Sequence, residues 1–363
     1  MTWISAYGCT SAAGFSTEEL WFGLNNGLDH SRPIDNSGEN FPRAYSFPNK
    51  NSNKNQRELL VENLLCSWQQ LNKKIKYSEK LGIILASTKG FIDDVVWAEE
   101  IPSQDCISPI LNDFIERADI SPKRTVCVSN ACTSGISALF LANSWIEKGI
   151  VEEVLLLAAD AVGPFVIRGF QSLKVLTMDK TRPFSDVRSG FFLGEATAAI
   201  LLTKKIGPFF IRGVGIDSEG YAVTRPSQSG NSLKKAIQIA KRNFKNPLDL
   251  ILAHGTATQL NDKIEDQVFY DLFFERKEFP TITASKWSIG HTLATSGILD
   301  LILGCEAIKN QKVFSIANSI QKDPNFLCEY LTLGKSTNRK VDNFLVSSLG
   351  FGGLHASVIV ERG

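Results

Sequence analysis

The feature of this chain that most constrains its fold is the alternation of short apolar runs with segments of helical periodicity. The runs "LGIILAS" from Leu81 and "EVLLLAAD" from Glu153 have the composition of strands that are buried on both faces of a sheet. Similar runs begin at Thr125, Thr197, Phe209, Leu248, Thr281, Phe344 and Ala356. Apolar residues follow helical spacing in residues 17–27, 57–74, 136–149, 231–244, 263–273 and 296–310. Strands that alternate with helices predict an α/β fold.

The length of 363 residues, 43% of them hydrophobic, is enough for a large core in one large domain or two mid-sized ones. A midpoint near Lys204 divides the chain into halves 1–205 and 206–363, which hold comparable strands and helices. No strict repeat relates the sequences of the two halves. Residues 36–56 are rich in Asn, Ser and Pro, which predicts an exposed loop.

Charge and composition narrow the class of protein. The formal net charge of +1 gives no reason to expect nucleic acid or a membrane surface as a partner. The start of the sequence lacks the basic and long apolar segments of a signal peptide, and no apolar stretch is long enough to span a bilayer. We therefore expect a cytoplasmic protein. The seven cysteines are odd in number and include no CxxC pair, which favours neither a disulfide scaffold nor a zinc site.

One cysteine occupies an unusual position. The segment "TVCVSNACTSG" from Thr125 predicts a strand, a tight turn and a helix start, with Cys132 among small residues in the turn. At a helix N-terminus, free N–H groups and the positive end of the helix dipole lower the pKa of a thiol and can hold an oxyanion. Cys132 is therefore either an activated nucleophile for acyl transfer or a compact helix-start residue.

Two histidines follow predicted strands directly. His254 lies in "LDLILAHGTATQLND" and His291 in "TITASKWSIGHTLATSG", and ligand sites collect at the carboxyl ends of strands in open α/β sheets. Matching positions for two of the four histidines, together with Cys132, favour a shared catalytic site over separate structural roles. No nearby carboxylate has ligand spacing, which disfavours zinc. We expect His30 to face solvent and His355 to pack rather than line the site.

These segments resemble ordered motifs of the elongating β-ketoacyl-acyl carrier protein synthases, the family that also forms the ketosynthase domains of polyketide synthases. "NACTSG" resembles the nucleophile turn, and "RPFSDVRSGFFLGEA" from Arg182 resembles the Pro-Phe-Asp…Arg-x-Gly-Phe…Gly-Glu motif. "AHGTATQLNDKIE" and "SKWSIGHTLATSG" are similar to the two histidine motifs, and "GFGGLHA" to the closing turn. Initiating synthases would have asparagine at His291, and thiolases a second cysteine in the closing turn.

The resemblance implies the thiolase-type fold, in which two similar α/β halves form five layers, α-β-α-β-α, usually in a dimer. Residues 1–205 would carry Cys132 as the acyl-accepting nucleophile, and residues 206–363 would carry His254 and His291, the pair that drives decarboxylation. The backbone N–H groups of Cys132 and Phe351 would form the oxyanion hole. The resemblance further implies an active-site lysine, its acidic partner, two pantetheine-binding threonines, a gating aromatic and an acyl-pocket residue: Lys286, Asp300, Thr256, Thr258, Phe351 and Phe170.

The reaction implied by the resemblance is a decarboxylative Claisen condensation. Cys132 would take an acyl group from a carrier thioester, and the enolate formed by decarboxylation of malonyl-acyl carrier protein would attack it, giving a β-ketoacyl-acyl carrier protein. The substrates travel on the phosphopantetheine arm of the acyl carrier protein, and no metal or redox cofactor is expected. The expected partners are this carrier and a second subunit, either another copy of the chain or a related chain-length factor.

The chain departs from the family at several positions. It is shorter than typical members, mostly between residues 45 and 125, a region that contributes to the dimer interface and the acyl pocket. Leu349, Thr133, Trp287 and the pair Leu354-His355 also differ from the usual residues. We therefore expect a specialised pathway for fatty acids, polyketides, polyenes or aryl-primed chains. Two alternatives stay open: a chain-length-factor-like subunit, which typically loses the cysteine, and a non-decarboxylating acyltransferase, which would lose one histidine.

Overall fold

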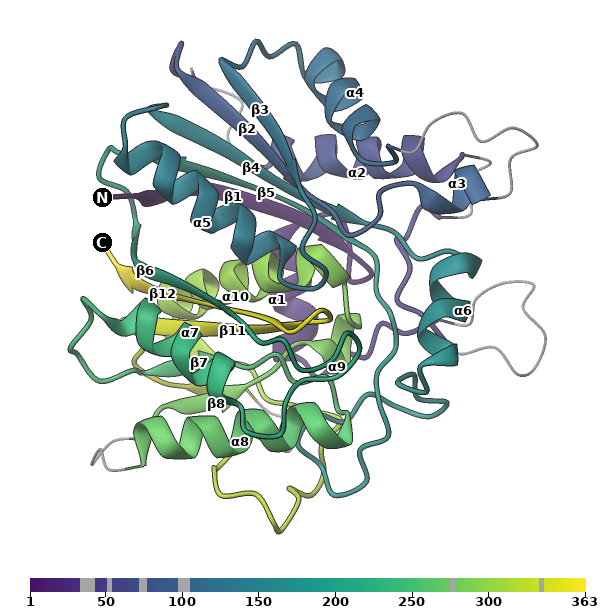
Figure 1. The fold of residues 1–363 in the computed structure, drawn as a ribbon, viewed down its shortest axis with the longest axis vertical. Helices are drawn as coiled ribbons and strands as arrows, with labels where there is room; N and C mark the ends of the chain where they lie inside the picture. Colours follow the sequence, from purple (N-terminus) through teal and green to yellow (C-terminus); the bar gives the residue numbers. More distant parts are fainter. Residues whose placement is uncertain (33–42, 51–53, 72–76, 97–104, 275–278, 333–335) are drawn as a thin grey trace.

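The central feature of the fold is one long mixed sheet (Figure 1). In the computed structural model, which describes residues 1–32, 43–50, 54–71, 77–96, 105–274, 279–332 and 336–363, ten strands join in the order β3-β2-β4-β5-β1-β6-β12-β11-β7-β8. These strands are β1 (Trp3–Ser11), β2 (Leu81–Ala86), β3 (Arg124–Val128), β4 (Glu153–Asp160), β5 (Ala196–Thr203), β6 (Phe209–Ser218), β7 (Leu250–Leu252), β8 (Thr281–Thr283), β11 (Asn343–Gly350) and β12 (Leu354–Arg362). A separate small ladder pairs β9 (Lys312–Val313) with β10 (Thr337–Asn338).

The pairing pattern of the sheet is the same on both sides of its middle. From β1 outward, β1–β5 and β5–β4 are antiparallel, and β4–β2 and β2–β3 are parallel. From β6 outward, β6–β12 and β12–β11 are antiparallel, and β11–β7 and β7–β8 are parallel. The two groups meet where Trp3 and Ile4 pair with Phe210 and Phe209. The boundary predicted after residue 205 stays a prediction, and it falls between the last strand of one group and the first of the other.

Helices cover both groups of strands and also lie between them, which gives the predicted order of layers (Figure 1). α2 and α4 lie outside the β1–β5 group, α5 and α10 lie between the groups, and α7 and α8 lie outside the other group. The helices are α1 (Thr17–Asn25), α2 (Gln56–Gln69), α3 (Ile92–Val96), α4 (Ser108–Ala118), α5 (Ser134–Glu147), α6 (Pro164–Ser172), α7 (Asn231–Lys241), α8 (Gln259–Phe273), α9 (Lys286–Ile289), the 3₁₀ turn η1 (Leu293–Thr295) and α10 (Ser296–Asn310).

The apolar runs of the sequence form the core of this arrangement. β2, β4 and β5 are buried along their whole lengths because helices pack against both of their faces. α10 is buried almost throughout, as expected for a helix that lies between two sheets. The α/β class predicted from the sequence is therefore confirmed. No helix in the described part of the chain combines the length and the apolar composition needed to cross a bilayer.

Two local predictions are wrong. Within residues 36–56, the described residues are not uniformly exposed: Tyr45 and Phe47 are buried, and the Tyr45 hydroxyl donates to the Asp29 carboxylate at 2.9 Å. Aromatic side chains between polar residues are therefore inserted into the core. Residues 36–42 and 51–53 lie outside the described residues. His30 is half-buried instead of solvent-facing, because its ring packs against the backbone of Gly23.

Candidate active site

Cys132 lies in a tight turn between β3 and α5. The helix begins at Ser134, so the cysteine stands just before the N-cap residue Thr133. Ala131 adopts a φ of 48°, in the left-handed region where small residues are tolerated best. The Ser134 hydroxyl closes the turn: it accepts from the Asn130 N–H at 2.8 Å and donates to the Ala131 carbonyl at 2.6 Å. The predicted strand, turn and helix are confirmed.

The expected lowering of the Cys132 pKa is wrong for the free protein. Burial raises the pKa of this thiol to about 11, since a thiolate loses its hydration there. The positive charge of Lys286 and the backbone N–H groups of Phe351 and Cys132 itself act in the opposite direction, towards a lower pKa. These groups reduce the free energy needed to form the thiolate, but they do not outweigh the effect of burial. The thiol is therefore neutral in the free protein, but groups that would stabilise its thiolate already lie beside it.

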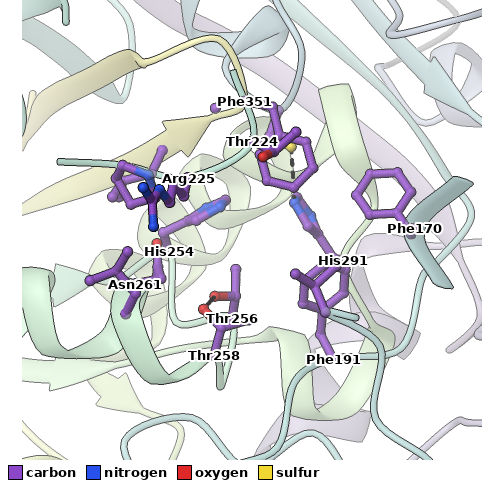
Figure 2. A pocket seen from close by; sticks show the side chains of 16 residues that line it. Phe170, Phe191, Thr224, Arg225, His254, Thr256, Thr258, Asn261, His291 and Phe351 are labelled. Carbon is purple, nitrogen blue, oxygen red and sulfur yellow. Dashed lines mark hydrogen bonds between the residues drawn. The ribbon is translucent and has the colours of Figure 1, made fainter. Parts of the chain in front are cut away.

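The rings of the two predicted histidines lie beside each other, and that of His291 contacts this thiol (Figure 2). Nε2 of His291 lies 3.1 Å from Sγ of Cys132, and the rings of His254 and His291 are 5.1 Å apart and nearly perpendicular. Burial and the nearby Lys286 hold the pKa of both imidazoles well below the usual range, so both rings are neutral. Nδ1 of His291 accepts the Leu293 N–H at 3.3 Å, which leaves the ring proton on Nε2. His291 thus presents an N–H donor to the site.

The close crossing of two central segments accounts for this geometry. A Cβ added at Gly135, in the first turn of α5, would lie 2.6 Å from the Ala294 carbonyl oxygen in η1. A Cβ at Gly297 would lie 2.8 Å from the side chain of Ile136. Only glycine permits so short an approach between these segments. The segment that follows His291 is therefore held directly against the helix that follows Cys132.

Lys286 and its predicted partner form a buried pair, and the lysine is near enough for its charge to act on both histidines. Both side chains are buried, and Nζ of Lys286 is 3.5 Å from a carboxylate oxygen of Asp300. The Ser285 hydroxyl donates to the other oxygen of Asp300 at 2.5 Å. Burial raises the pKa of Asp300, and the Lys286 charge opposes that rise. The Asp300 side chain thus reaches the lysine that it is predicted to partner.

Two carboxylates of α8 hold the loop that carries His254, a role that sequence reasoning missed. Glu265 accepts the backbone N–H groups of His254 and Gly255, each at 2.7 Å. Asp262 accepts the N–H of Ala257 at 3.1 Å and that of Phe184 at 2.7 Å. Burial raises the pKa of both carboxyl groups, that of Asp262 to about 7. The available signal was a pair of acidic residues with helical spacing in the second half of the first histidine motif.

A cavity of about 140 Å³ leads to the thiol and the two imidazoles (Figure 2). Thr256 and Thr258 line it, with their hydroxyl oxygens 3.1 Å apart. Sequence reasoning gave no role to several further lining residues: Val175, Phe191, Thr224, Arg225, Pro226, Leu260, Asn261 and Leu349. Phe191 packs edge-on against the His291 ring at 5.1 Å. Arg225 is exposed and comes from the segment before α7, which carries none of the recognised motifs.

A second cavity, of about 460 Å³, also reaches Cys132. It lies along α6 and shares Cys132, Phe170 and Phe351 with the first cavity. The rings of Phe170 and Phe351 are stacked with their centroids 5.6 Å apart. These two aromatic side chains therefore border both cavities beside the thiol. The structure thus places Phe170 and Phe351 beside the thiol, while their roles as acyl-pocket residue and gating aromatic stay predictions.

The glycine-rich turn that carries Phe351 is tied to the segment before α7. The Gly352 N–H donates to the Val223 carbonyl at 2.6 Å, and the Glu219 N–H donates to the Gly353 carbonyl at 2.9 Å. Gly352 and Gly353 both have positive φ values, of 84° and 76°. His355 packs in the interior beyond the turn, as predicted, with Nε2 3.2 Å from a carboxylate oxygen of Glu219. No group of His, Cys, Asp and Glu in the described residues has a metal-binding arrangement.

The chain belongs to the β-ketoacyl synthase family. The family model "Beta-ketoacyl synthase, N-terminal domain" matches residues 124–206, and "Beta-ketoacyl synthase, C-terminal domain" matches residues 209–319, together more than half of the chain. The first matched segment contains Cys132, and the second contains both His254 and His291. The recognition made from the sequence motifs is therefore confirmed.

Curated relatives carry related names. The chain is 28% identical to the granaticin polyketide putative β-ketoacyl synthase 1 of Streptomyces violaceoruber over 253 residues, 65% of this chain and 60% of that protein. It is 25% identical to 3-oxoacyl-[acyl-carrier-protein] synthase 2 of Staphylococcus aureus over 251 residues, 64% of this chain and 60% of that protein. The matched part thus spans about 60% of the length of these relatives.

Solved structures share the fold. A chain of the ishigamide ketosynthase/chain length factor superimposes with a TM-score of 0.87 at 20% identity, covering 100% of this chain and 99% of that one. A chain of the Xenorhabdus doucetiae ketosynthase in complex with its chain length factor gives a TM-score of 0.83 at 21% identity, covering 100% and 98%. The thiolase-type architecture predicted by the resemblance is therefore confirmed.

Proposed function

We propose that this protein catalyses the decarboxylative condensation of a Cys132-bound acyl group with malonyl-acyl carrier protein. The observation that carries the proposal is the contact of 3.1 Å between the Cys132 sulfur and Nε2 of His291, with the His254 ring 5.1 Å from that of His291. A nucleophile and two neutral imidazoles at the end of one cavity are the groups that acylation and decarboxylation require. Membership of the β-ketoacyl synthase family supports the same reaction.

In the first step, the Cys132 sulfur attacks the carbonyl carbon of an acyl thioester delivered by the carrier. The acyl–sulfur bond to the pantetheine arm breaks, and the thiol proton of Cys132 leaves with the departing pantetheine sulfur. The backbone N–H groups of Phe351 and Cys132, which favour negative charge at this sulfur, would also stabilise the oxyanion of the tetrahedral intermediate. The acyl chain would occupy the second cavity, along α6.

In the second step, a malonyl thioester takes the place of the first carrier arm. Loss of carbon dioxide leaves an enolate, whose oxygen would accept hydrogen bonds from the two imidazoles. His291 suits this role because its Nε2 carries the proton and the ring is neutral. The carbanion then attacks the Cys132 thioester and displaces the sulfur as its thiolate. The product is a β-ketoacyl thioester longer by two carbons.

The first cavity would hold the pantetheine arm against Thr256 and Thr258, whose hydroxyl groups line it. Both steps use acyl and malonyl thioesters and no metal or redox cofactor. All seven cysteines are free, which supports a cytoplasmic, reducing location. The partners of this proposal are an acyl carrier protein and a second subunit, with no role for nucleic acid or membranes.

The relatives of this chain also suggest the kind of pathway in which it acts. Curated relatives include named polyketide synthases, such as the tetracenomycin polyketide synthase ketoacyl synthase alpha subunit of Streptomyces glaucescens. Structural neighbours include ketosynthases solved with a chain length factor. We infer a specialised fatty-acid, polyketide or polyene pathway, with either a homodimer or a pair with a related subunit. A non-catalytic subunit or a simple acyltransferase is less well supported, because Cys132, His254 and His291 are all present and assembled.

Mass spectrometry of intact protein and carrier tests the proposal. With acyl- and malonyl-carrier supplied, the wild type should give a carrier-bound β-ketoacyl product, and Cys132→Ala should give neither acyl-enzyme nor product. His254→Ala and His291→Ala should still be acylated but should release carbon dioxide from malonyl-carrier at least about a hundredfold more slowly. Cys328→Ala, a buried cysteine outside both cavities, is the control. Acylation of Cys132→Ala at the wild-type rate would reject the proposal.

A further inference from the structure

The second cavity contains a charged side chain in a mostly apolar lining. Phe165, Val166, Leu173 and Leu293 supply much of its surface, while Thr88 and Lys89 stand together in its lining. Among the described residues that line this cavity, Lys89 alone is charged, and its side chain is only 15% exposed. A hydrocarbon chain alone gives no reason to place an ammonium group here. None of the recognised motifs includes Lys89.

This lysine forms an ion pair with one carboxylate, that of Asp160, which can engage only part of its three N–H donors. Nζ of Lys89 lies 3.5 Å from Asp160, the longest of the contacts that this carboxylate makes. Asp160 accepts closer hydrogen bonds from the Ser87 hydroxyl at 3.0 Å, the Thr88 hydroxyl at 2.9 Å and the Ala294 N–H at 2.8 Å. Its oxygens are thus already occupied by shorter bonds, and an ammonium group has three N–H donors. Lys89 retains donor capacity beside the cavity.

The energetic consequence depends on what enters the cavity. A plain hydrocarbon chain would displace water from the ammonium group and offer no acceptor in return, which is costly for a charged group. A chain that carries an oxygen acceptor would replace the lost water with a charge-assisted hydrogen bond. We propose that Lys89 selects acyl groups that bear an oxygen acceptor, such as a keto, hydroxyl or carboxylate oxygen, over saturated hydrocarbon chains. This inference rests on the proposed function, because it assumes that the chain on Cys132 occupies this cavity.

The test compares pairs of acyl-carrier thioesters of similar length that differ in one oxygen-bearing group. Suitable pairs are butanoyl with 3-oxobutanoyl, pentanoyl with 4-hydroxypentanoyl, and hexanoyl with the thioester of pentanedioic acid. The rate of Cys132 acylation is followed by intact mass. In the wild type, at least one oxygen-bearing chain should react faster than its partner, on the order of tenfold to a hundredfold. Lys89→Met, of similar length but uncharged, should bring that ratio close to one, and Lys89→Arg should preserve it.

The ratio within a pair separates recognition from a structural role. If Lys89 only supported Asp160, Lys89→Met would slow both members of each pair equally and leave the ratio unchanged, which would overturn the inference. A wild type that prefers the hydrocarbon member of every pair would overturn it without any variant. Complete absence of Cys132 acylation with every thioester would instead overturn the proposed function. Acylation without a Lys89-dependent ratio overturns this inference alone.

Discussion

Lys286 influences the ionisation of all three groups at the centre of the site. Its charge lowers the pKa of Cys132, His254 and His291, in each case alongside a larger effect of burial. For the imidazoles both effects favour the neutral ring, whereas for the thiol they oppose each other. The histidines are therefore neutral hydrogen-bond donors, while the pKa of the thiol is set by two opposing effects. This difference accounts for the separate roles proposed for the two kinds of residue.

The raised pKa of Cys132 predicts a particular pH dependence. Because the pKa is about 11, the thiolate fraction, and with it the rate of alkylation by iodoacetamide, should rise about tenfold per pH unit from pH 7 to pH 10. Free cysteine, with a pKa near 8.5, should level off above about pH 9 under the same conditions. Peptide mass spectrometry would assign the reaction to Cys132. A plateau reached near neutral pH would contradict the account.

Lys286→Met extends this prediction. Loss of the positive charge raises the pKa of Cys132 further, so the thiolate fraction at any pH in this range falls and alkylation should be slower, on the order of tenfold. Lys309→Met, which removes an exposed lysine far along α10, is the matched control and should leave the rate unchanged. Equal alkylation rates in wild type and Lys286→Met would show that the charge does not act on the thiol.

The central helices set the geometry of the site. α5 begins just after Cys132, and η1 and α10 begin just after His291, so their mutual packing fixes the distance between sulfur and imidazole. Gly135 is a point of very tight approach between the two segments, since an added Cβ would meet the Ala294 carbonyl. A fixed backbone atom cannot move aside as a flexible side chain would. Small displacements of these elements therefore change the site directly.

Gly135→Ala should change both the stability of the fold and the position of His291 relative to the thiol, and each effect can be measured. Overpacking at this crossing should destabilise the fold by about 1–3 kcal/mol and lower the rate of condensation more than the rate of Cys132 acylation, because displacement of η1 moves His291 away from the thiol. Gly169→Ala in α6 is the control for stability alone, since nothing lies within 4 Å of its added Cβ but the residue lines the second cavity. It should stabilise by about 0.5–1 kcal/mol. A fully stable and active Gly135→Ala variant would contradict this reading of the crossing.

Several elements were visible in the sequence and others were not. β4 and β5 were predictable because burial on both faces makes their sequences continuously apolar. β1 was missed because its residues are mixed, with both exposed and buried positions along the strand. α6 was missed because it is short and begins at Pro164. α4 was missed although its buried residues Ile110, Leu111 and Phe114 follow helical spacing. Where the local sequence pattern is weak, tertiary packing stabilises the element, and a single sequence does not show that packing.

The candidate site lies where the two groups of strands meet. Cys132 comes from the first group of elements, and His254, His291 and Lys286 from the second, so no local segment contains the site. The motifs nevertheless identified these residues. Cys132 and His254 follow closely after β3 and β7, whereas Lys286 lies in α9 and His291 comes just after that helix. Lys89 follows closely after β2 but belongs to none of the recognised motifs, and the place of Arg225 in its cavity depends on tertiary contacts alone. The motif residues are thus predictable, while those that shape the cavities are not.

The free edge of the sheet predicts how the molecule assembles. β3 is the outermost strand of its group, and Arg124 and Thr125 on it are exposed. An open edge is a natural place for pairing with a second subunit. Thr125→Pro removes a backbone donor from the strand, so it should weaken dimer formation at least about tenfold in sedimentation experiments, whether the partner is another copy or a related subunit. Thr125→Ala, which keeps the donor, should not. Unchanged assembly of Thr125→Pro would place the interface elsewhere.

The most direct test of the central claim, that one thiol and two imidazoles act on a single thioester, is a crystal structure of the protein with an amide analogue of malonyl-pantetheine. In this analogue an amide carbonyl oxygen replaces the thioester oxygen. That oxygen should lie within about 3.2 Å of a ring nitrogen of both His254 and His291, with the arm in the cavity beside Thr256 and Thr258. An analogue whose carbonyl contacts neither imidazole, while its arm fills this cavity, would contradict the claim.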